Sequence, residues 1–262
     1  MTAPRSPHLG LHLDGSVATL TLDRPEVLNA LSVDLLEDLV TACRWLATQQ
    51  QLRVVILTGA GRTFSAGADL STMERLLAEG PEARAAADAG DRAAGAIESL
   101  PAVTVAAIQG RCVGGGVVLA LACDLRLAST TARFSIPEVD LGIPLAWGGI
   151  PRLLREVPPA VARDLVLTCR EFDAQEALGL GLVTRVHPPE ELAEAATALA
   201  AELADKARLP VRATLDAVAA HLGVGAPRGW SDADSLLTAV RDPECRAAAR
   251  AYVARVFGSG GG

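Results

Sequence analysis

At 262 residues, the chain is long enough for one large domain, and a composition of 50% hydrophobic and 21% charged residues lets it bury a sizeable core. That composition excludes extensive disorder, and a net charge of −7 without a basic stripe argues against nucleic-acid binding. Five scattered cysteines without a CxxC pair indicate buried free thiols in a reducing cytoplasm, and four histidines without metal-like spacing predict no metal site. Without a signal core or an apolar run of ~20 residues, we expect no membrane partner.

The first predicted elements are a hairpin, a helix and a buried strand. Apolar and polar residues alternate over 9–22 around the turn signal Asp14-Gly15, which predicts a β-hairpin. Ser32 is a good N-cap, and the apolar residues after it recur at helical spacing, so we expect an amphipathic helix over 33–48. The continuous apolar run 54–57 predicts a strand covered on both faces.

The middle of the chain continues the alternation of strands and helices. A loop of small residues over 59–70 follows the buried strand and leads to a helix expected at 72–79. In chain order we then expect a helix over 82–99, a strand over 103–108, a helical run over 117–122 and a strand over 124–128. Strands that alternate with helices predict a parallel sheet with helical crossovers, and therefore an α/β fold.

The last third turns helical. We expect, in order, a loop over 134–149, helices over 159–170 and 173–179, a strand over 182–186, and helices over 189–206, 210–222 and 231–257. Asp173 with Glu176 three residues later is the pattern of a capping box. The helical end predicts an appendage, packed either on its own core or on a neighbouring subunit. We divide the chain into a core over 1–200 and a helical C-terminal segment over 201–262.

Three consecutive glycines, Gly114 to Gly116, need a reason, because glycine loses the most freedom when a chain folds. They lie between a predicted strand and a predicted helix, where backbone amides without side chains can approach a negatively charged oxygen. Tight packing of the helix on the sheet is the alternative reason. If the loop 65–70 supplies a second amide, the two N–H groups can stabilise an enolate formed beside a thioester carbonyl.

Glu138 is the candidate proton carrier. It lies in an otherwise apolar stretch, where burial would raise the pKa of its carboxyl toward the range useful for general acid–base catalysis. A surface or capping glutamate after Pro137 is the alternative. We interpret three other acidic residues as structural: Asp140, Asp69 as a helix cap, and Asp124 as the residue that orders the turn into the next strand.

Several short motifs stand in order along the chain. They are Arg24-Pro25, Asn29-Ala30-Leu31, Phe64 to Leu70, Gly110 to Asp124, Phe134 to Glu138, Leu141-Gly142, Gly148-Gly149 and Arg152-Leu153. Their order and spacing resemble the crotonase superfamily, also called the enoyl-CoA hydratase/isomerase family, over about residues 10–200. The resemblance implies a crotonase-like spiral of ββα turns with a helical C-terminal trimerisation segment, in a homotrimer or a dimer of trimers. It also implies an acyl-CoA thioester substrate, with coenzyme A as part of the substrate and no separate cofactor.

By matching positions, the resemblance implies that the amides of Ala68 and Gly115 form the oxyanion hole. Glu138 matches the second of the two glutamates that hydratases of the family use, whereas the first position holds Val118 here. The residues expected to contact substrate or coenzyme A are Arg24, Ala66, Asp69, Leu70, Gly114, Val118 and Trp147. Ala66 and its neighbours would line the adenine pocket, Arg24 and Arg62 are candidates for the CoA phosphates, and Trp147 either narrows the acyl pocket or serves packing.

A lone glutamate suits a reaction that moves one proton between two carbons of the same substrate. The sequence therefore favours a Δ3,Δ2-enoyl-CoA isomerase, in which Glu138 removes a proton from C2 and returns it at C4. One alternative is a 2-enoyl-CoA hydratase that works with a single carboxylate or a replacement from elsewhere. Another is a non-catalytic acyl-CoA-binding homologue that kept the oxyanion loops.

Overall fold

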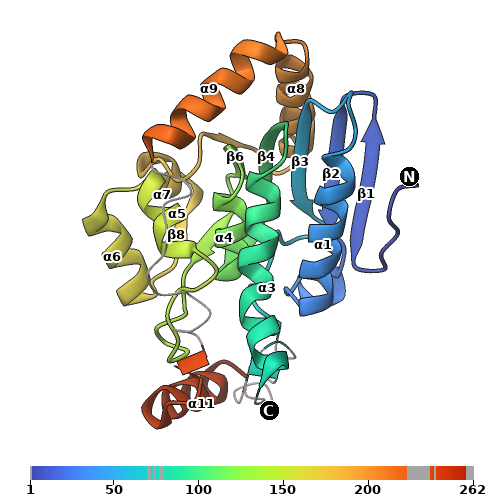
Figure 1. Cartoon of the computed structure of the whole chain (residues 1–262). Helices are drawn as coiled ribbons and strands as arrows, with labels where there is room; N and C mark the ends of the chain where they lie inside the picture. Colours follow the sequence, from blue (N-terminus) through green and yellow to red (C-terminus); the bar gives the residue numbers. More distant parts are fainter. Residues whose placement is uncertain are drawn as a thin grey trace.

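A computed structural model of the chain describes residues 2–69, 72, 75–76, 80–222, 237–238 and 240–257 (Figure 1). In this part of the chain, six strands form one sheet in the order β1-β2-β3-β4-β6-β9, and three form a second in the order β5-β7-β8. The large sheet contains β1 (Leu9–Asp14), β2 (Val17–Leu22), β3 (Val54–Gly59), β4 (Val103–Ile108), β6 (Leu125–Ser129) and β9 (Arg185–His187). The small sheet contains β5 (Arg111–Val113), β7 (Arg133–Ser135) and β8 (Phe172–Asp173).

The helices alternate with these strands and then continue alone. They are α1 (Val33–Leu46), α3 (Pro81–Glu98), α4 (Gly115–Leu121), α5 (Gly149–Glu156), α6 (Pro159–Thr168), α7 (Ala174–Gly179), α8 (Leu192–Ala204), α9 (Arg208–His221) and α11 (Pro243–Phe257), with a 3₁₀ turn η1 (Pro25–Val27) before α1. Among the described helices, none is both long and apolar enough to cross a bilayer.

The large sheet is parallel except for its first pair. β1 and β2 form the predicted antiparallel hairpin, with Asp14 opposite Val17 and Gly15 at φ 55° in the turn. From β2 onward every pairing in this sheet is parallel, as the alternation of strands and helices predicts. The α/β expectation is confirmed.

Helices cover the central strands on both faces. α1 and α3 lie side by side over one face in Figure 1, and α8 packs on the other. Alternate side chains of β3 divide accordingly: Val55 and Leu57 belong to the main core, whereas Val54 and Ile56 pack with Leu199 and other residues of α8. The interpretation of this apolar run as a doubly covered strand is confirmed, because period-2 alternation sends apolar residues to both faces.

Two helix starts agree with their capping signals. Ser32 Oγ accepts a hydrogen bond of 3.2 Å from Leu35 N at the start of α1. Asp173 Oδ1 accepts one of 2.8 Å from Glu176 N at the start of α7. The reciprocal half of the predicted capping box is not formed, since the Glu176 carboxylate binds Arg170 at 2.6 Å instead.

Sequence patterns missed the short elements and misplaced some ends. The three strands of the small sheet were not predicted, and α5 begins where we expected a loop to end. Strands of two or three residues are too short for a hydrophobic period to appear. β7 and β8 are instead held by a long-range contact, the stacking of Phe134 on Phe172 with ring centroids 5.4 Å apart. The strand expected over 182–186 is the shorter β9, which starts three residues later and ends one residue later, and the strand expected over 124–128 starts and ends one residue later.

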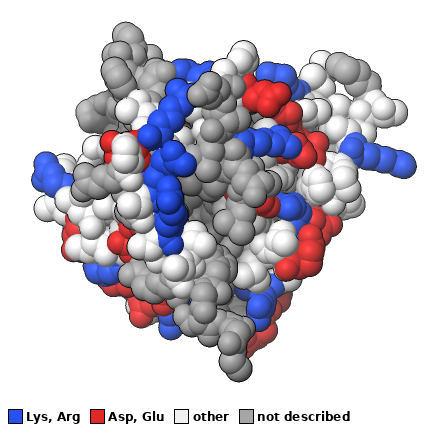
Figure 2. All heavy atoms as spheres, turned by 90° about the horizontal axis from the view of Figure 1, so that it is seen from below, with Lys and Arg blue, Asp and Glu red and all other residues white. Residues whose placement is uncertain are grey.

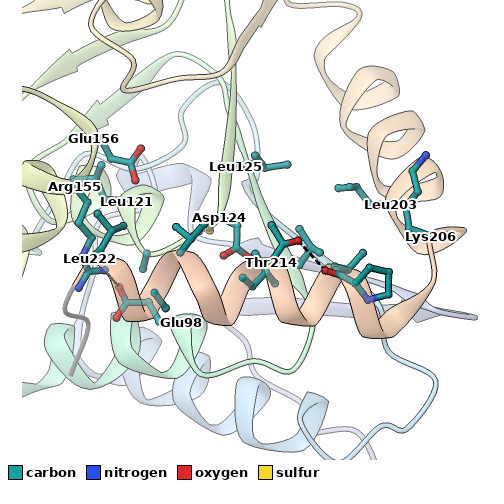
Figure 3. Close-up of a pocket in the computed structure, with 18 of the residues that line it drawn as sticks. Glu98, Leu121, Asp124, Leu125, Arg155, Glu156, Leu203, Lys206, Thr214 and Leu222 are labelled. Atoms are coloured by element: carbon teal, nitrogen blue, oxygen red, sulfur yellow. Dashed lines mark hydrogen bonds and ion pairs between the residues drawn. The ribbon is translucent and has the colours of Figure 1, made fainter.

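The helical end of the chain reaches two opposite parts of the molecule. α9 lies across a groove of about 670 Å³ beside the C-terminal ends of α3, α4 and α5 (Figure 3). Arg208 anchors its first turn by donating to the carbonyls of Gln50 and Leu52. Leu237 and Val240 are buried in the main core of the chain.

Parts of two predicted helices lie outside the described residues. Of the helix expected over 72–79, only Thr72, Arg75 and Leu76 are described, and they are helical. Of the helix expected over 231–257, residues 231–236 and 239 are not described, and α11 accounts for its second half. The five cysteines are all free, and three of them are buried as expected: Cys43, Cys112 and Cys123.

Candidate active site

The loop that carries Ala68 is fixed by a buried asparagine. Asn29 Nδ2 donates to the carbonyls of Ala60 at 2.9 Å and Thr63 at 2.7 Å, and Asn29 Oδ1 accepts from Arg24 N at 2.9 Å. Asn29 is fully buried and has φ 54°, a backbone conformation that asparagine tolerates better than most residues. The asparagine of the Asn29-Ala30-Leu31 motif therefore shapes the loop rather than touching a ligand.

Two loops far apart in the sequence run side by side. Ser65 N donates to Arg111 O at 3.1 Å, and Val113 N donates to Ser65 O at 3.0 Å. A Cβ on Gly116 would lie 2.9 Å from Ser65 Cβ, so the start of α4 approaches this loop at close range. Close packing and ligand approach were alternative reasons for the glycines, and packing is the reason for Gly116.

The backbone amides of Ala68 and Gly115 have no hydrogen-bond acceptor among the residues that the structure describes. Leu31 bonds to the residues on both sides of Ala68, accepting from Asp69 N and donating to Gly67 O, so the intervening N–H of Ala68 points away from Leu31. Gly115 is the first residue of α4, where an N–H has no partner within the helix. Both amides are thus available to an external oxygen.

The side chain of Glu138 packs against the glycine turn, Gly114 to Gly116, at Gly114. It lies in the turn after β7, where Ile143 N donates to its carbonyl at 3.0 Å. Its Oε1 occupies the space that a Cβ on Gly114 would need, and its buried Oε2 has no hydrogen-bond partner among the described residues. Burial raises the pKa of the Glu138 carboxyl from 4.5 to about 7. Of the two alternatives for this residue, the buried one is correct.

One small cavity brings the predicted catalytic groups together. Its volume is about 40 Å³. The described residues that line it are Ala68, Thr72, Leu76, Gly115, Val118, Glu138, Ile143, Pro144, Leu145, Ala146 and Trp147. Within this lining Glu138 is the only titratable side chain, and Val118, at the position that the resemblance gives to the first glutamate, is a buried apolar group. Among the described residues, the arrangement offers one bound molecule a single carboxyl and two amides without an acceptor.

Other predicted site residues lie outside this lining. Arg24 Nη1 pairs with Asp69 Oδ2 at 2.6 Å and donates to Ala30 O, so each of the two side chains already has a partner. Ala66 is half-buried, and its amide donates to Leu28 O. Leu70 lies outside the described residues. Roles for Arg24, Ala66, Asp69 and Leu70 toward coenzyme A stay predictions.

Arg62 is exposed, as a phosphate-binding side chain would be. On the face of the molecule seen from below, basic side chains form a band, and acidic side chains lie on the same face (Figure 2). Asp124 has the structural role that we predicted, because its Oδ2 accepts from both the amide and the hydroxyl of Thr104 at the start of β4.

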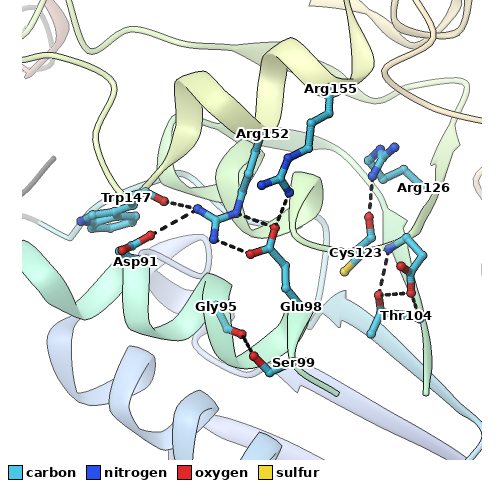
Figure 4. A network of polar contacts seen from close by, with 11 residues as sticks. Asp91, Gly95, Glu98, Ser99, Thr104, Cys123, Arg126, Trp147, Arg152 and Arg155 are labelled. Atoms are coloured by element: carbon cyan, nitrogen blue, oxygen red, sulfur yellow. Dashed lines mark hydrogen bonds and ion pairs between the residues drawn. The ribbon is translucent and has the colours of Figure 1, made fainter. Parts of the chain in front are cut away.

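An arginine cluster behind the cavity had no predicted role. Arg152 is 2% exposed and binds both carboxylate oxygens of Glu98, at 3.0 and 2.7 Å, while its Nη1 donates to Trp147 O at 2.6 Å (Figure 4). Arg155 binds the same carboxylate at 2.7 Å. This cluster ties α3 and α5 to the backbone of a cavity-lining residue. The Arg152-Leu153 motif signalled its importance, but the partner in α3 was not readable from the sequence.

Comparison with known proteins gives consistent results. A family model described as enoyl-CoA hydratase/isomerase matches residues 12–253. A short-chain-enoyl-CoA hydratase of Clostridium acetobutylicum is 37% identical over 209 residues, which cover 79% of each chain. A crotonyl-CoA hydratase of Syntrophomonas wolfei is 37% identical over 215 residues, or 82% of this chain and 81% of that one.

Solved structures show the same architecture. The crystal structure of an enoyl-CoA hydratase from Mycobacterium avium subsp. paratuberculosis superposes with a TM-score of 0.86 at 29% identity, over 94% of this chain and 99% of that one. An enoyl-CoA hydratase from Bacillus anthracis superposes with a TM-score of 0.78 at 32% identity, over 95% and 92% of the two chains. The crotonase-like fold that the motifs implied is confirmed by these superpositions.

Proposed function

The chain belongs to the enoyl-CoA hydratase/isomerase family, and we propose that it is an acyl-CoA enzyme in which Glu138 alone carries protons to and from the substrate. The observation that supports this most is the cavity lining, where one carboxyl with a pKa of about 7 shares the space with the free amides of Ala68 and Gly115. A group whose pKa lies near the working pH can both accept and return a proton.

The amides would act on the thioester oxygen. Removing a proton from C2 leaves negative charge on that oxygen, and two fixed N–H donors stabilise the enolate without having to reorganise. Gly115 and Val118 are buried, so little water screens the interaction at the Gly115 amide. The Glu138 carboxylate takes the C2 proton and becomes a neutral carboxyl, which is the form that burial favours.

Isomerisation is the reaction that we propose first. With a 3-enoyl-CoA, loss of the C2 proton gives a dienolate, and return of the same proton at C4 moves the double bond to C2–C3. No second acid or base is needed for this sequence. Val118, where hydratases of the family carry their first glutamate, favours it over a reaction in which two carboxylates share a water molecule.

Hydration of a 2-enoyl-CoA is the second candidate, because the relatives described above are named hydratases. Glu138 would then take a proton from water as the oxygen attacks C3, and return one to C2. A cavity of about 40 Å³ has room for one water molecule. A non-catalytic homologue is the third, and it would bind acyl-CoA without converting either substrate.

Parallel assays of one preparation separate the three. We expect 3-hexenoyl-CoA to be isomerised faster than 2-hexenoyl-CoA is hydrated, and Glu138→Gln to lower that isomerisation about 10²–10⁴-fold. Glu190→Gln, the same change at an exposed glutamate, is the matched control and should leave the rate unchanged. Faster hydration would favour the second candidate, and binding without turnover the third. Undiminished turnover by Glu138→Gln would discard Glu138 as the proton carrier.

A further inference from the structure

The side chain of Trp147 lies in a slot that two glycines leave open. A Cβ on Gly90 in α3 would overlap Cδ2 and Cε2 of the indole, and a Cβ on Gly115 in α4 would overlap Cζ3. The indole is therefore held between α3 and α4. Its six-membered ring lies against Gly115, the residue whose amide is proposed to bind the thioester oxygen. Trp147 is 6% exposed and lines the cavity that contains Glu138.

The backbone of Trp147 is held in an uncommon conformation. Its φ is 55°, in the left-handed region that bulky residues rarely adopt, and Gly148 follows at φ 67°. The Trp147 carbonyl accepts a hydrogen bond of 2.6 Å from Arg152, whose guanidinium is fixed by Glu98 (Figure 4). A strained backbone conformation persists only where the surrounding contacts hold it in place, and such conformations are found often at ligand-binding sites.

The indole N–H of Trp147 has no acceptor among the described residues. Nε1 is buried and without a hydrogen-bond partner among the residues that the structure describes. A tryptophan N–H usually finds a partner when it is buried, and leaving one unpaired destabilises the protein. Nε1 is bonded to Cε2, which lies across the six-membered ring from Cζ3. Cζ3 faces Gly115, so the N–H lies at the opposite end of the indole from the Gly115 amide. The two are separated by about the width of the six-membered ring.

Few other groups of the lining can bind a polar atom of the substrate. Apart from Glu138, Thr72 and Trp147, the described side chains around the cavity are apolar. An acyl group whose thioester oxygen lies at the Gly115 amide and whose chain runs along the indole would extend its distal carbons toward the end of the ring that carries Nε1.

We propose that Trp147 is a specificity-determining residue, whose indole N–H donates a hydrogen bond to an oxygen on the distal part of the acyl group. The preferred substrates are then acyl-CoA thioesters with a hydrogen-bond acceptor beyond the reacting carbons, rather than plain hydrocarbon chains. This inference rests on the proposed function, because it takes the thioester to be bound at the amides of Ala68 and Gly115.

Equilibrium binding tests the inference without turnover. Calorimetry would compare hexanoyl-CoA with 4-oxohexanoyl-CoA and 5-oxohexanoyl-CoA, whose keto oxygens accept but do not donate hydrogen bonds. We expect wild-type protein to bind at least one keto thioester about tenfold or more tightly than hexanoyl-CoA, since a site with an unpaired donor discriminates against a ligand without an acceptor. Trp147→Phe, which keeps an aromatic ring but lacks the N–H, should lose this preference.

Two further variants guard against a merely structural effect. Incorporation of 3-benzothienylalanine at position 147 replaces the N–H by sulfur with almost no change of shape, and it should lose the preference as well. Trp45→Phe, a change at a tryptophan outside the cavity lining, should keep it. No preference in the wild type, or a preference kept by both position-147 variants, would overturn the inference. If hexanoyl-CoA itself fails to bind the wild type, the proposed function fails along with it.

Discussion

At the scale of residues, the proposed chemistry depends on the carboxyl of Glu138, the one titratable group among the described residues of the cavity lining. The buried Oε2 of Glu138 has no hydrogen-bond partner in the part of the chain that the structure describes, and the carboxyl has a pKa of about 7, whereas an exposed glutamate is ionised throughout the neutral range. Both its protonation states are therefore accessible at neutral pH. The sequence indicated this correctly, because Glu138 follows an apolar stretch. The significance of Val118, an apolar residue where the family's hydratases have their first glutamate, could be recognised only by comparison with the family pattern.

Burial of Glu138 has a consequence for stability. Its folded-state pKa is raised from 4.5 to about 7, so its contribution to stability is fully present below pH 4.5 and is lost as pH rises through 7. Glutamine cannot ionise, and Glu138→Gln should therefore become more stable relative to wild type between pH 5 and pH 8.5. At 1.36 kcal/mol for each pKa unit, the gain in the free energy of unfolding is at most about 3 kcal/mol.

Urea denaturation of both proteins at the two pH values measures this difference. Glu190→Gln serves as the control, because it makes the same change at an exposed side chain. If the free energies of unfolding of wild type and Glu138→Gln changed with pH in the same way, the Glu138 carboxyl could not be desolvated as described.

At the scale of elements, the glycine turn connects β5 to α4 and positions Glu138. Gly114 has φ 50° and ψ −114°, and a Cβ at this position would meet the Glu138 carboxyl. Gly114→Ala should therefore destabilise the protein by about 1–3 kcal/mol and displace the carboxyl, with a large loss of activity. Gly95→Ala is the matched control in α3, where a Cβ would meet nothing within 4 Å; it should be neutral or stabilising by up to about 1 kcal/mol.

Thermal unfolding and the 3-hexenoyl-CoA assay report the two effects separately. An active and stable Gly114→Ala protein would show that the turn tolerates a side chain, and that Glu138 is not held as described.

The arginine cluster couples α3 to α5. Arg152 is nearly inaccessible to solvent and binds Glu98 and the Trp147 carbonyl, so Arg152→Met takes the donor from the buried Trp147 carbonyl and leaves the Glu98 carboxylate to Arg155. We expect a loss of about 3 kcal/mol in the free energy of unfolding. Arg170→Met removes two exposed ion pairs, with Asp164 and Glu176, and should change stability by less than about 1 kcal/mol. Equal losses of unfolding free energy in Arg152→Met and Arg170→Met would mean that the arginine cluster stabilises the protein no more than exposed ion pairs do.

The long elements could be predicted from sequence, whereas the short ones could not. α1 and β3 each carry a sustained apolar period, and Ser32 marks the helix start. The three-residue strands β5 and β7 carry no period, because they are determined by pairing with each other across the chain. The same limit applies to α5, whose burial depends on contacts with α4.

At the scale of the whole molecule, the site depends on contacts that no local pattern encodes. The neighbouring positions of Ala68 and Gly115 were predicted through family resemblance, because motif order fixes which loops meet. The slot for Trp147 was not predicted, since it requires Gly90 and Gly115 to be empty at the same place on two helices. The homotrimer or dimer of trimers implied by the resemblance stays a prediction.

The central claim is that a thioester oxygen binds the amides of Ala68 and Gly115 while Glu138 moves the proton on the adjacent carbon. Exchange of the C2 protons of butanoyl-CoA in D2O, followed by proton NMR, tests this step whether the enzyme is an isomerase or a hydratase. We predict that wild-type protein replaces the C2 protons by deuterium, and that Glu138→Gln does so about 10²–10⁴-fold more slowly. Exchange at the wild-type rate in Glu138→Gln, or no exchange with the wild type, would contradict the claim.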